Sequence, residues 1–349
     1  MSKISLRFHP HELQFHFEAG TSRGVLTKKK SYFVELSDGV RCGIGEAGPL
    51  FGLSPEFSDD CTAAFEKALR PFQGLYLPED INEWITEIPF EQPSFRFALE
   101  TAYHDLTEPF TNDFAVGKKS LPINGLIWMG TADFMRKQIE QKLQQGYSCL
   151  KLKIGAIDFD TELSLLKSIR SRFSGEELTL RVDANGAFSP VEAPYKLEKL
   201  AAYDLHSIEQ PIKAGQPEEM RKLVAKQILP IALDEELIGM SDKSIADFIN
   251  PDYIILKPSF LGGLQASRDW IDWATAKGKN WWITSALESN IGLQAIAQFT
   301  GDYDIKIPQG LGTGQLYINN FASGLSIEKG NISFDPIFSR ESPFQPLSL

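Results

Sequence analysis

Short apolar runs alternate with amphipathic stretches along the chain from about residue 121. The runs are rich in Ile, Val and Leu, which is typical of parallel strands that are buried on both faces. The predicted strands cover residues 122–129, 149–154, 178–183, 206–211, 230–233, 253–257 and 281–285. Because a helical stretch follows each run, the series predicts a closed (β/α) barrel rather than an open sheet.

The stretches between these runs carry apolar residues at intervals of three and four positions, which predicts helices. The predicted helices cover residues 132–145, 160–172, 190–203, 217–227, 243–249 and 264–277. Thr131 and Asp160 are suitable N-caps for the first two of them. One more helix is expected at 291–299, and residues 305–314 leave room for a last short strand and a loop.

The first 120 residues follow a different pattern. Residues 6–16 and 30–36 alternate between polar and apolar positions like antiparallel strands, and the glycine-containing segment 20–24 forms a loop between them. Residues 55 to 113 then show helical periodicity, interrupted at 76–79. The N-terminal part is therefore predicted to be an α+β unit distinct from the barrel.

The C-terminal tail alternates again at residues 325–334, and we expect it to return to the first sheet. This gives a capping domain built from residues 1–120 together with 320–349. The catalytic barrel domain is then expected to cover residues 121–319.

The composition is that of a soluble globular protein, with 42% hydrophobic and 23% charged residues in 349. A net charge of −11 without a long Lys/Arg block disfavours nucleic acid or an anionic membrane as partner. The N-terminus lacks the apolar core of a signal peptide, and no later stretch is long enough to span a bilayer. The three cysteines lack CxxC spacing and indicate reduced thiols. These features predict a cytoplasmic protein that acts on a small molecule.

Three acidic residues, Asp183, Glu209 and Asp234, each end an apolar run. They are spaced about 25 residues apart, roughly one strand plus one helix, so they would meet at one edge of a parallel sheet. Each alone is compatible with a helix N-cap, but three at matched strand ends indicate an oxygen site suited to Mg²⁺. Glu235 and Glu236 leave the exact third ligand open by one position, and Asp234 is preferred because it directly follows the apolar run. Asn185 is expected to hydrogen-bond the ligands from behind.

Lysines occupy two of the neighbouring strands. Lys151 and Lys153 lie two residues apart and therefore share one face of their strand. Two lysines inside a barrel would be costly to bury unless carboxylates or a metal accompany them. Like charges at this separation lower each other's pKa, which favours a general base near neutral pH. Lys257 ends a later strand and is expected to face the same mouth.

Polar segments follow the last two strands of the predicted barrel. In the first, Ser285, Glu288, Ser289 and Asn290 are expected to present hydroxyl and amide groups to a ligand carboxylate. The second, 310–314, contains Gly312 and Thr313 and suits an anion, although such glycine-rich segments are more often plain turns.

The chain resembles the enolase superfamily over nearly its whole length, through five ordered stretches: Lys151-Leu152-Lys153, Val182-Asp183-Ala184-Asn185, Ile208-Glu209-Gln210-Pro211, Leu233-Asp234-Glu235 and Lys257-Pro258. The resemblance implies an α/β fold, with a modified TIM barrel of the (β/α)7β type and an α+β capping domain. A lysine on the sixth barrel strand is typical of the muconate-lactonizing-like subgroup.

Within this subgroup, segments 285–292 and 310–316 are most similar to the o-succinylbenzoate synthases of menaquinone biosynthesis. These are hydro-lyases that use Mg²⁺, with Mn²⁺ as a substitute, to dehydrate 2-succinyl-6-hydroxy-2,4-cyclohexadiene-1-carboxylate through an enediolate. The resemblance implies that Lys153 removes the proton and returns it to the departing hydroxyl in a syn elimination. It assigns stabilisation of the enediolate to Lys257, and lowering of the pKa of Lys153 to Lys151.

The same resemblance implies that two segments of the cap close over the substrate. One is the loop 20–24, which contains Arg23, and the other is the segment 48–54. Closure of such segments excludes water from the reacting groups.

Other activities stay open on the sequence. N-acylamino acid racemases and cycloisomerases share the scaffold, whereas dipeptide epimerases carry Asp-x-Asp where this chain has Glu288-Ser289-Asn290. An aldolase-type barrel would form a Schiff base on one of the lysines without a metal, and would leave the three carboxylates unexplained. A non-catalytic barrel is expected to lose site residues, and here all five motif positions are filled.

Overall fold

An antiparallel sheet of long strands forms the N-terminal part of the protein. The computed structural model describes residues 3–21 and 24–344. The sheet has the order β1-β2-β3, with β1 (Ser5–Thr21), β2 (Gly24–Ser37) and β3 (Cys42–Ala47). The two predicted strands are confirmed and are longer than their alternating patterns indicated, whereas β3 was not predicted.

Helices cover one face of this sheet. They are α1 (Thr62–Leu69), the 3₁₀ helix η1 (Arg70–Phe72), α2 (Asn82–Ile85) and α3 (Pro93–Thr107). Helix α3 packs directly on the backbone of β3, where a Cβ added at Gly45 would lie 1.8 Å from the carbonyl oxygen of Ala98. The small residues that permit this approach also gave β3 a weak strand signal.

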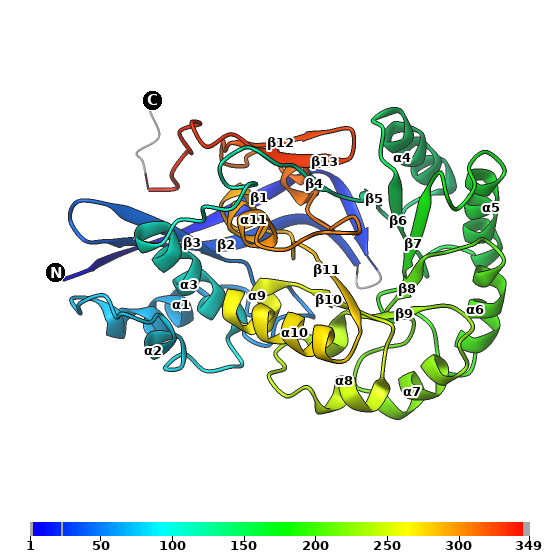
Figure 1. Ribbon diagram of the computed structural model, residues 1–349, viewed down its shortest axis with the longest axis horizontal. Helices are drawn as coiled ribbons and strands as arrows, with labels where there is room; N and C mark the ends of the chain where they lie inside the picture. The colour runs from blue at the N-terminus through cyan, green and yellow to red at the C-terminus, as the bar shows by residue number, and fades with distance from the viewer. Residues whose placement is uncertain (1–2, 22–23, 345–349) are drawn as a thin grey trace.

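A parallel sheet of seven strands in the order β11-β10-β9-β8-β7-β6-β5 forms the barrel in the described part of the chain. The strands are β5 (Gly125–Ile127), β6 (Cys149–Lys153), β7 (Thr179–Asp183), β8 (Ser207–Glu209), β9 (Ile231–Leu233), β10 (Tyr253–Leu256) and β11 (Asn280–Ile283). The helices are α4 (Ala132–Gln144), α5 (Phe159–Arg170), α6 (Ala193–Ala201), α7 (Pro217–Ala225), α8 (Ser244–Ile249), α9 (Pro258–Leu261), α10 (Leu264–Ala276) and α11 (Asn290–Thr300). Figure 1 shows α4 to α7 on the outer side, away from the N-terminal sheet. Most of the predicted strands and helices are confirmed with shifted ends. The predicted strand 122–129 is divided into β4 (Leu121–Pro122), which belongs to another sheet, and β5. The short α9 and the 3₁₀ helices η2 (Glu235–Leu237) and η3 (Thr313–Leu316) were not expected.

The barrel is closed by a very short eighth segment. Gln309 pairs with Ile123 and Gly310 pairs with Thr284, both in parallel. The Gln309 carbonyl accepts from the amide of Asn124 at 2.9 Å, and the amide of Gly310 donates to Ile283 O at 2.8 Å. The expected (β/α)7β order is therefore present, with 309–310 as its last strand.

The helix caps agree with the sequence in one case and differ in the other. Thr131 Oγ1 accepts from the amide of Phe134 at the start of α4, as predicted. Helix α5 is capped by Asp158, whose carboxylate accepts from the amide of Thr161 at 3.0 Å, and not by Asp160, which lies in its first turn. The N-cap lies two residues before the predicted one, because Phe159 packs against the core and extends the apolar face.

The strands of the tail do not join the first sheet, which corrects the prediction. β12 (Leu325–Glu328) and β13 (Asn331–Phe334) pair with each other, and β13 pairs with β4 (Leu121–Pro122), the segment that leads into the barrel. Ile332 is buried in the barrel core, so burial of this residue fixes the tail there. The residues on either side of the strands do contact the cap: the ring of Phe321 packs on Phe33, and Arg340 pairs with Asp105 of α3.

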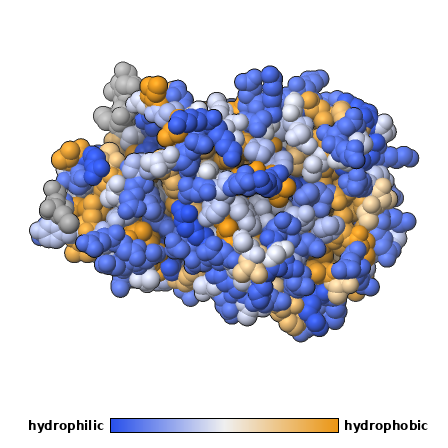
Figure 2. All heavy atoms as spheres, in the orientation of Figure 1, coloured by the Kyte–Doolittle hydropathy of each residue, from blue (hydrophilic) through white to orange (hydrophobic). Residues whose placement is uncertain are grey.

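The largest cluster of buried residues lies inside the barrel and between its strands and helices, and a second cluster lies between the N-terminal sheet and its helices. The face seen in Figure 2 is mostly hydrophilic with scattered apolar residues. Among the described residues, no helix is long and apolar enough to cross a membrane. Cys42, Cys61 and Cys149 form no disulfide, as predicted.

Candidate active site

The charged residues singled out in the sequence lie at the carboxyl ends of the barrel strands. Lys153 of β6 is in register with Asp183 of β7, which is in register with Glu209 of β8. Asp234 and Lys257 follow the last residues of β9 and β10. We call these five residues, together with Lys151, the reaction end of the site. Because β6 and β10 lie four places apart in the barrel, Lys153 and Lys257 face each other from opposite walls.

The lysines pair with the carboxylates. Lys151 Nζ lies 3.1 Å from Asp183 Oδ2 and 2.6 Å from Glu209 Oε2, and its side chain is buried. Lys153 Nζ lies 3.2 Å from Asp183 Oδ2, and Lys257 pairs with Asp234. The barrel thus compensates its buried lysines with carboxylates, as the burial argument predicted.

These pairs shift the pKa values in opposite directions. Burial lowers the pKa of Lys151, but the carboxylates of Asp183 and Glu209 outweigh it and hold that pKa above its ordinary value. The expectation that neighbouring lysines lower each other's pKa is therefore wrong for Lys151, because the attraction of the carboxylates outweighs burial there. Burial likewise raises the pKa of Asp183, but the ammonium groups of Lys151 and Lys153 keep it well below its ordinary range.

Glu209 differs from Asp183 in the direction of its pKa shift. Burial and repulsion from Asp183 raise its pKa well above the ordinary value, and its Oε1 is buried without a hydrogen-bond partner among the described residues. With ammonium groups between the carboxylates, no three or more His, Cys, Asp or Glu side chains in the described chain converge as a metal cluster. The donor chemistry nevertheless suits a hard divalent cation, since all predicted ligands are carboxylates and one oxygen remains unsatisfied.

Asn185 and Glu235 support the reaction end from one side. The Oδ1 of Asn185 accepts from Lys153 Nζ at 2.7 Å, and its Nδ2 donates to Glu235 Oε1 at 3.0 Å. Its amide donates to Asp183 Oδ1 at 3.0 Å with φ at 44°, a left-handed conformation that asparagine tolerates. Asn185 thereby fixes both a lysine and a carboxylate.

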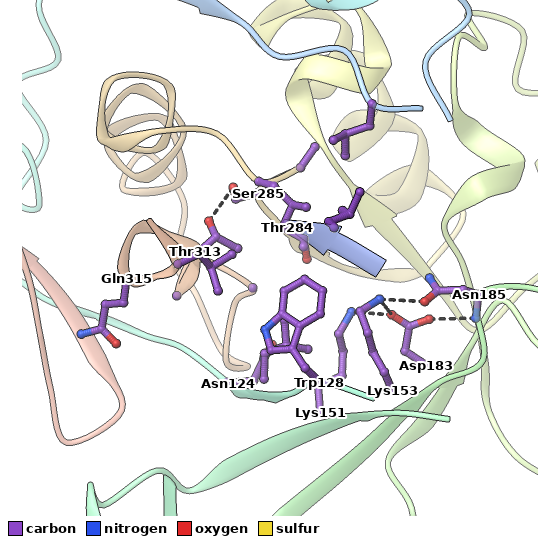
Figure 3. A pocket seen from close by; sticks show the side chains of 18 of the residues that line it. Asn124, Trp128, Lys151, Lys153, Asp183, Asn185, Thr284, Ser285, Thr313 and Gln315 are labelled. Carbon is purple, nitrogen blue, oxygen red and sulfur yellow. Dashed lines mark hydrogen bonds and ion pairs between the residues drawn. The ribbon is translucent and has the colours of Figure 1, made fainter. Parts of the chain in front are cut away.

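A cavity of about 500 Å³ opens above these charges. It is lined by apolar side chains of the cap and the barrel: Phe17, Val25, Leu26, Leu50, Phe51, Leu53, Leu126, Trp128, Phe134, Phe260, Leu287 and Leu316. Ser285, Gly312 and Thr313, which were predicted to bind the substrate, also line this cavity. We call Leu26, Leu50, Trp128, Ser285 and Thr313 the recognition end. Figure 3 shows the lysines with Asp183 and Asn185 on one side, Ser285 and Thr313 on the other, and Trp128 between them in this view.

The hydroxyl groups of the recognition end form an ordered chain of donors. Thr313 Oγ1 donates to Ser285 Oγ at 2.7 Å, and Ser285 Oγ donates to Glu288 Oε2 at 2.5 Å. In this order of donors, the proton of Ser285 is directed to Glu288 and away from the cavity. The hydroxyl of Thr313 is then the one that can turn its proton towards a ligand.

The remaining predicted substrate contacts lie elsewhere. Glu288 and Ser289 are completely buried behind the wall and do not line the cavity. Asn290 donates to the carbonyl of Phe321 at 2.7 Å and joins α11 to the tail. Arg23 lies outside the described residues.

Several cavity residues were missed by sequence reasoning. Trp128 lies with its ring 5.7 Å from Lys153 Nζ, and the buried oxygens Asn124 Oδ1 and Thr284 Oγ1 have no hydrogen-bond partner among the described residues. Asn124 sits in the interruption between β4 and β5, and Thr284 directly follows β11. The position of Thr284 at the end of a barrel strand could have indicated a site residue in the sequence. Trp128 lies in an apolar run, which gave no such indication.

Comparison with known proteins gives matches over nearly the whole chain. The family model described as Enolase C-terminal domain-like matches residues 134–317. The chain is 46% identical to the o-succinylbenzoate synthase of Desulfotalea psychrophila, over 95% of this chain and 99% of that protein. The crystal structure of MenC from the same organism has a TM-score of 0.84 at 43% identity, covering 95% of this chain and all (100%) of that one. Muconate lactonizing enzyme from Pseudomonas fluorescens has a TM-score of 0.81 at 18% identity, covering 98% and 96%, and shares the fold.

Proposed function

The chain belongs to the enolase C-terminal domain-like family, and we propose that it catalyses the o-succinylbenzoate synthase reaction of menaquinone biosynthesis. The substrate would be 2-succinyl-6-hydroxy-2,4-cyclohexadiene-1-carboxylate, which loses the proton next to its carboxylate and its hydroxyl group to give o-succinylbenzoate and water. The observation that carries the proposal is that Lys153 and Lys257 face each other across one cavity above buried carboxylates.

The two lysines take different parts in this reaction. Lys153 would accept the proton in its neutral form and return it to the hydroxyl leaving from the same face, so that one side chain serves both steps of a syn elimination. Lys257, on the opposite wall, would place its positive charge beside the substrate carboxylate, where negative charge grows as the proton leaves. Lys151 is buried and bound to two carboxylates, which suits it to hold Asp183 and Glu209 in place.

The metal is part of the proposal. Asp183, Glu209 and Asp234, with Glu235 beside them, would hold Mg²⁺, and Mn²⁺ is expected to substitute for it. When bound, the cation supplies positive charge that stabilises the developing charge on the substrate carboxylate. The unsatisfied Oε1 of Glu209 supports this assignment.

The apolar recognition end suits the body of the substrate. The side chains of the cap and Trp128 would pack on the ring and the succinyl methylene groups and keep water away from the lysines. The Thr313 hydroxyl and the amides at 312–313 would bind the succinyl carboxylate. A biosynthetic enzyme for such a soluble acid is expected in the cytoplasm.

The structure disfavours two of the alternatives. Glu288 occupies the place where dipeptide epimerases of the subgroup hold an ammonium group, and here it is buried behind the wall. A Schiff base on Lys151 or Lys257 needs a neutral lysine, whereas Asp183 and Asp234 offset the effect of burial and raise the pKa values of Lys151 and Lys257 respectively. A Schiff base on Lys153 would leave the three carboxylates without a role.

The test is an ultraviolet assay of dehydration of the cyclohexadiene carboxylate by the full chain, with added Mg²⁺ and with EDTA. We expect turnover with Mg²⁺, loss of it with EDTA and recovery when Mg²⁺ is restored. If the protein binds Mg²⁺ in calorimetry but does not dehydrate this compound, the proposed reaction is wrong. Racemisation of an N-acylamino acid would then be measured next on the same sample.

A further inference from the structure

Glu46 of the cap is bound to the barrel by an unusually complete set of hydrogen bonds. It lies near the end of β3 and is completely buried. Its Oε1 accepts from Ser31 Oγ at 2.7 Å and from the amide of Ser289 at 2.9 Å. Its Oε2 accepts from Ser289 Oγ at 2.6 Å and from the amide of Gly292 at 3.0 Å. Both carboxylate oxygens are therefore saturated, and three of the four donors belong to the barrel.

Those three donors are the N-terminus of α11. The first amides of a helix have no partner within the helix, and a side chain of the same segment normally accepts from them. Ser289 accepts from the amide of Ile291 at 3.2 Å, while Glu46, distant in sequence, accepts from that of Gly292. A Cβ at Gly292 would lie 3.0 Å from Glu46 Oε2, so glycine leaves room for this contact.

The segment before α11 contributes Ser285 to the cavity, and we call Ser285 and Thr313 the hydroxyl wall. Ser285 and Ser259 both donate through their hydroxyls to Glu288, the residue before Ser289, each at 2.5 Å. Leu287 has φ at 66°, a conformation that costs a leucine free energy and persists only when its surroundings impose it. The anchoring of Ser289 by Glu46 is one of the contacts that impose it.

On the cap side, Glu46 is connected through the backbone to apolar residues that line the cavity. We call these cap residues, Leu26, Leu50 and Leu53, the apolar wall. The chain leaves β3 at Ala47 and continues into 48–54, where Leu50 and Leu53 line the cavity. Lys29 of β2 lies with its Nζ 3.9 Å from Glu46 Oε1 and donates to Ser31 Oγ at 3.3 Å. Residues 25 and 26, at the start of the same strand, line the cavity as well.

We infer that Glu46 is a positioning residue for substrate binding, because it fixes the apolar wall of the cap against the hydroxyl wall of the barrel. The inference rests on the proposed dehydration reaction for its assay. Glu46 does not contact the reaction end, so its loss separates the two walls without disturbing the lysines. Substrate affinity depends on this residue, and the chemical step does not.

A second buried glutamate provides the matched control. Glu100 of α3 accepts from the amides of Leu264 and Gln265 and so connects the cap to the N-terminus of α10. It has the same chemistry and a similar burial, but the helix that it caps does not follow the hydroxyl wall. If Glu46 had only a structural role, replacing either glutamate would lower Tm and leave KM unchanged.

The experiment compares Glu46→Gln with Glu100→Gln in the full chain. Glutamine keeps the size of the side chain but turns an amide N–H towards two of the four donors. We expect Glu46→Gln to raise KM for the cyclohexadiene carboxylate about tenfold, with kcat within about twofold of wild type. The dissociation constant of o-succinylbenzoate, measured by calorimetry, should rise by the same factor. Glu100→Gln should lower Tm and leave KM unchanged.

Two outcomes would overturn the inference: an unchanged KM in folded Glu46→Gln, or an equal rise of KM in Glu100→Gln. If Glu46→Gln does not fold, Ser289→Ala, which removes one donor to Glu46 Oε2, decides the question and should raise KM about threefold. Wild-type turnover in the same assay separates the two proposals. A wild type without dehydration activity contradicts the proposed function, whereas an active wild type with an unchanged KM in the variants contradicts only the role of Glu46.

Discussion

The two ends of the cavity are built on different physical principles. The reaction end consists of charged side chains on neighbouring barrel strands, and each lysine is paired with a carboxylate. The recognition end is neutral and combines apolar side chains of the cap with hydroxyl groups from two late loops of the barrel. One end depends on a single rigid sheet, and the other on contact between segments far apart in the sequence.

This difference predicts that the two ends can be perturbed separately. Charges on adjacent strands keep their positions as long as the barrel is folded, so changes there should affect the rate of the chemical step. The recognition end should affect binding, because its groups contact the distal part of the substrate. Four substitutions test this separation, from the largest expected effect to the smallest.

Replacement of Lys153 by alanine should have the largest effect. It removes the only group assigned to proton transfer, and we expect kcat to fall about 10³-fold or more with KM little changed. Steady-state kinetics of the purified variant measure both constants. The matched control is Lys222→Ala, which removes an exposed lysine of α7 and should leave both constants unaltered. A loss of less than about tenfold would contradict the assignment of Lys153 as base.

Replacement of Lys257 by methionine should have a smaller effect on the same constant. Methionine retains the length of the side chain but not its charge, so the growing negative charge loses one of its partners. We expect kcat to fall about 10²-fold. If KM rises and kcat is preserved, Lys257 binds the ground state, and the reaction end would then include substrate recognition.

Replacement of Thr313 by valine tests the recognition end. Valine is similar in shape but has no hydroxyl, so the donor that can turn towards the succinyl carboxylate is lost. We expect KM to rise about fivefold and kcat to stay within about twofold. Kinetics with Ser285→Ala serve for comparison, since the proton of Ser285 is directed to Glu288 and its loss should raise KM less. A larger effect in Ser285→Ala would show that the order of the donor chain is reversed.

The smallest effect is expected at the floor of the barrel, beneath the reaction end. Burial and the nearby Arg181 lower the pKa of His206 to about 4. The unfolded chain takes up this proton near pH 6.5, so the contribution of His206 to stability is present above that pH and is lost as the pH falls towards 4. Between pH 7 and pH 5, His206→Phe should lose about 2 kcal/mol less stability than wild type in urea unfolding, while kcat and KM stay unchanged. An identical pH dependence in both proteins would show that His206 does not titrate in this range.

The sequence was sufficient for most of the barrel. Strands and helices from residue 121 on were predicted within a few residues, because hydrophobic periodicity reports directly on which face of an element is buried. The resemblance to the enolase superfamily is confirmed by the family model and by the o-succinylbenzoate synthase of Desulfotalea psychrophila. The cap was predicted less well: β3 was missed because its glycines were selected by the approach of α3, a contact that is not local.

The candidate site divides in the same way. The sequence by itself placed Lys153, Asp183 and Glu209 at one edge of a sheet, since the β/α period and the pleat fix which residues meet there. Only the tertiary structure decided that Glu288 turns away from the cavity, that Glu46 reaches α11, and that the carboxylates raise the pKa of Lys151 despite its burial. The direction of a side chain, its partners and its charge state depend on groups brought together by folding, and no local pattern in the chain encodes those distances.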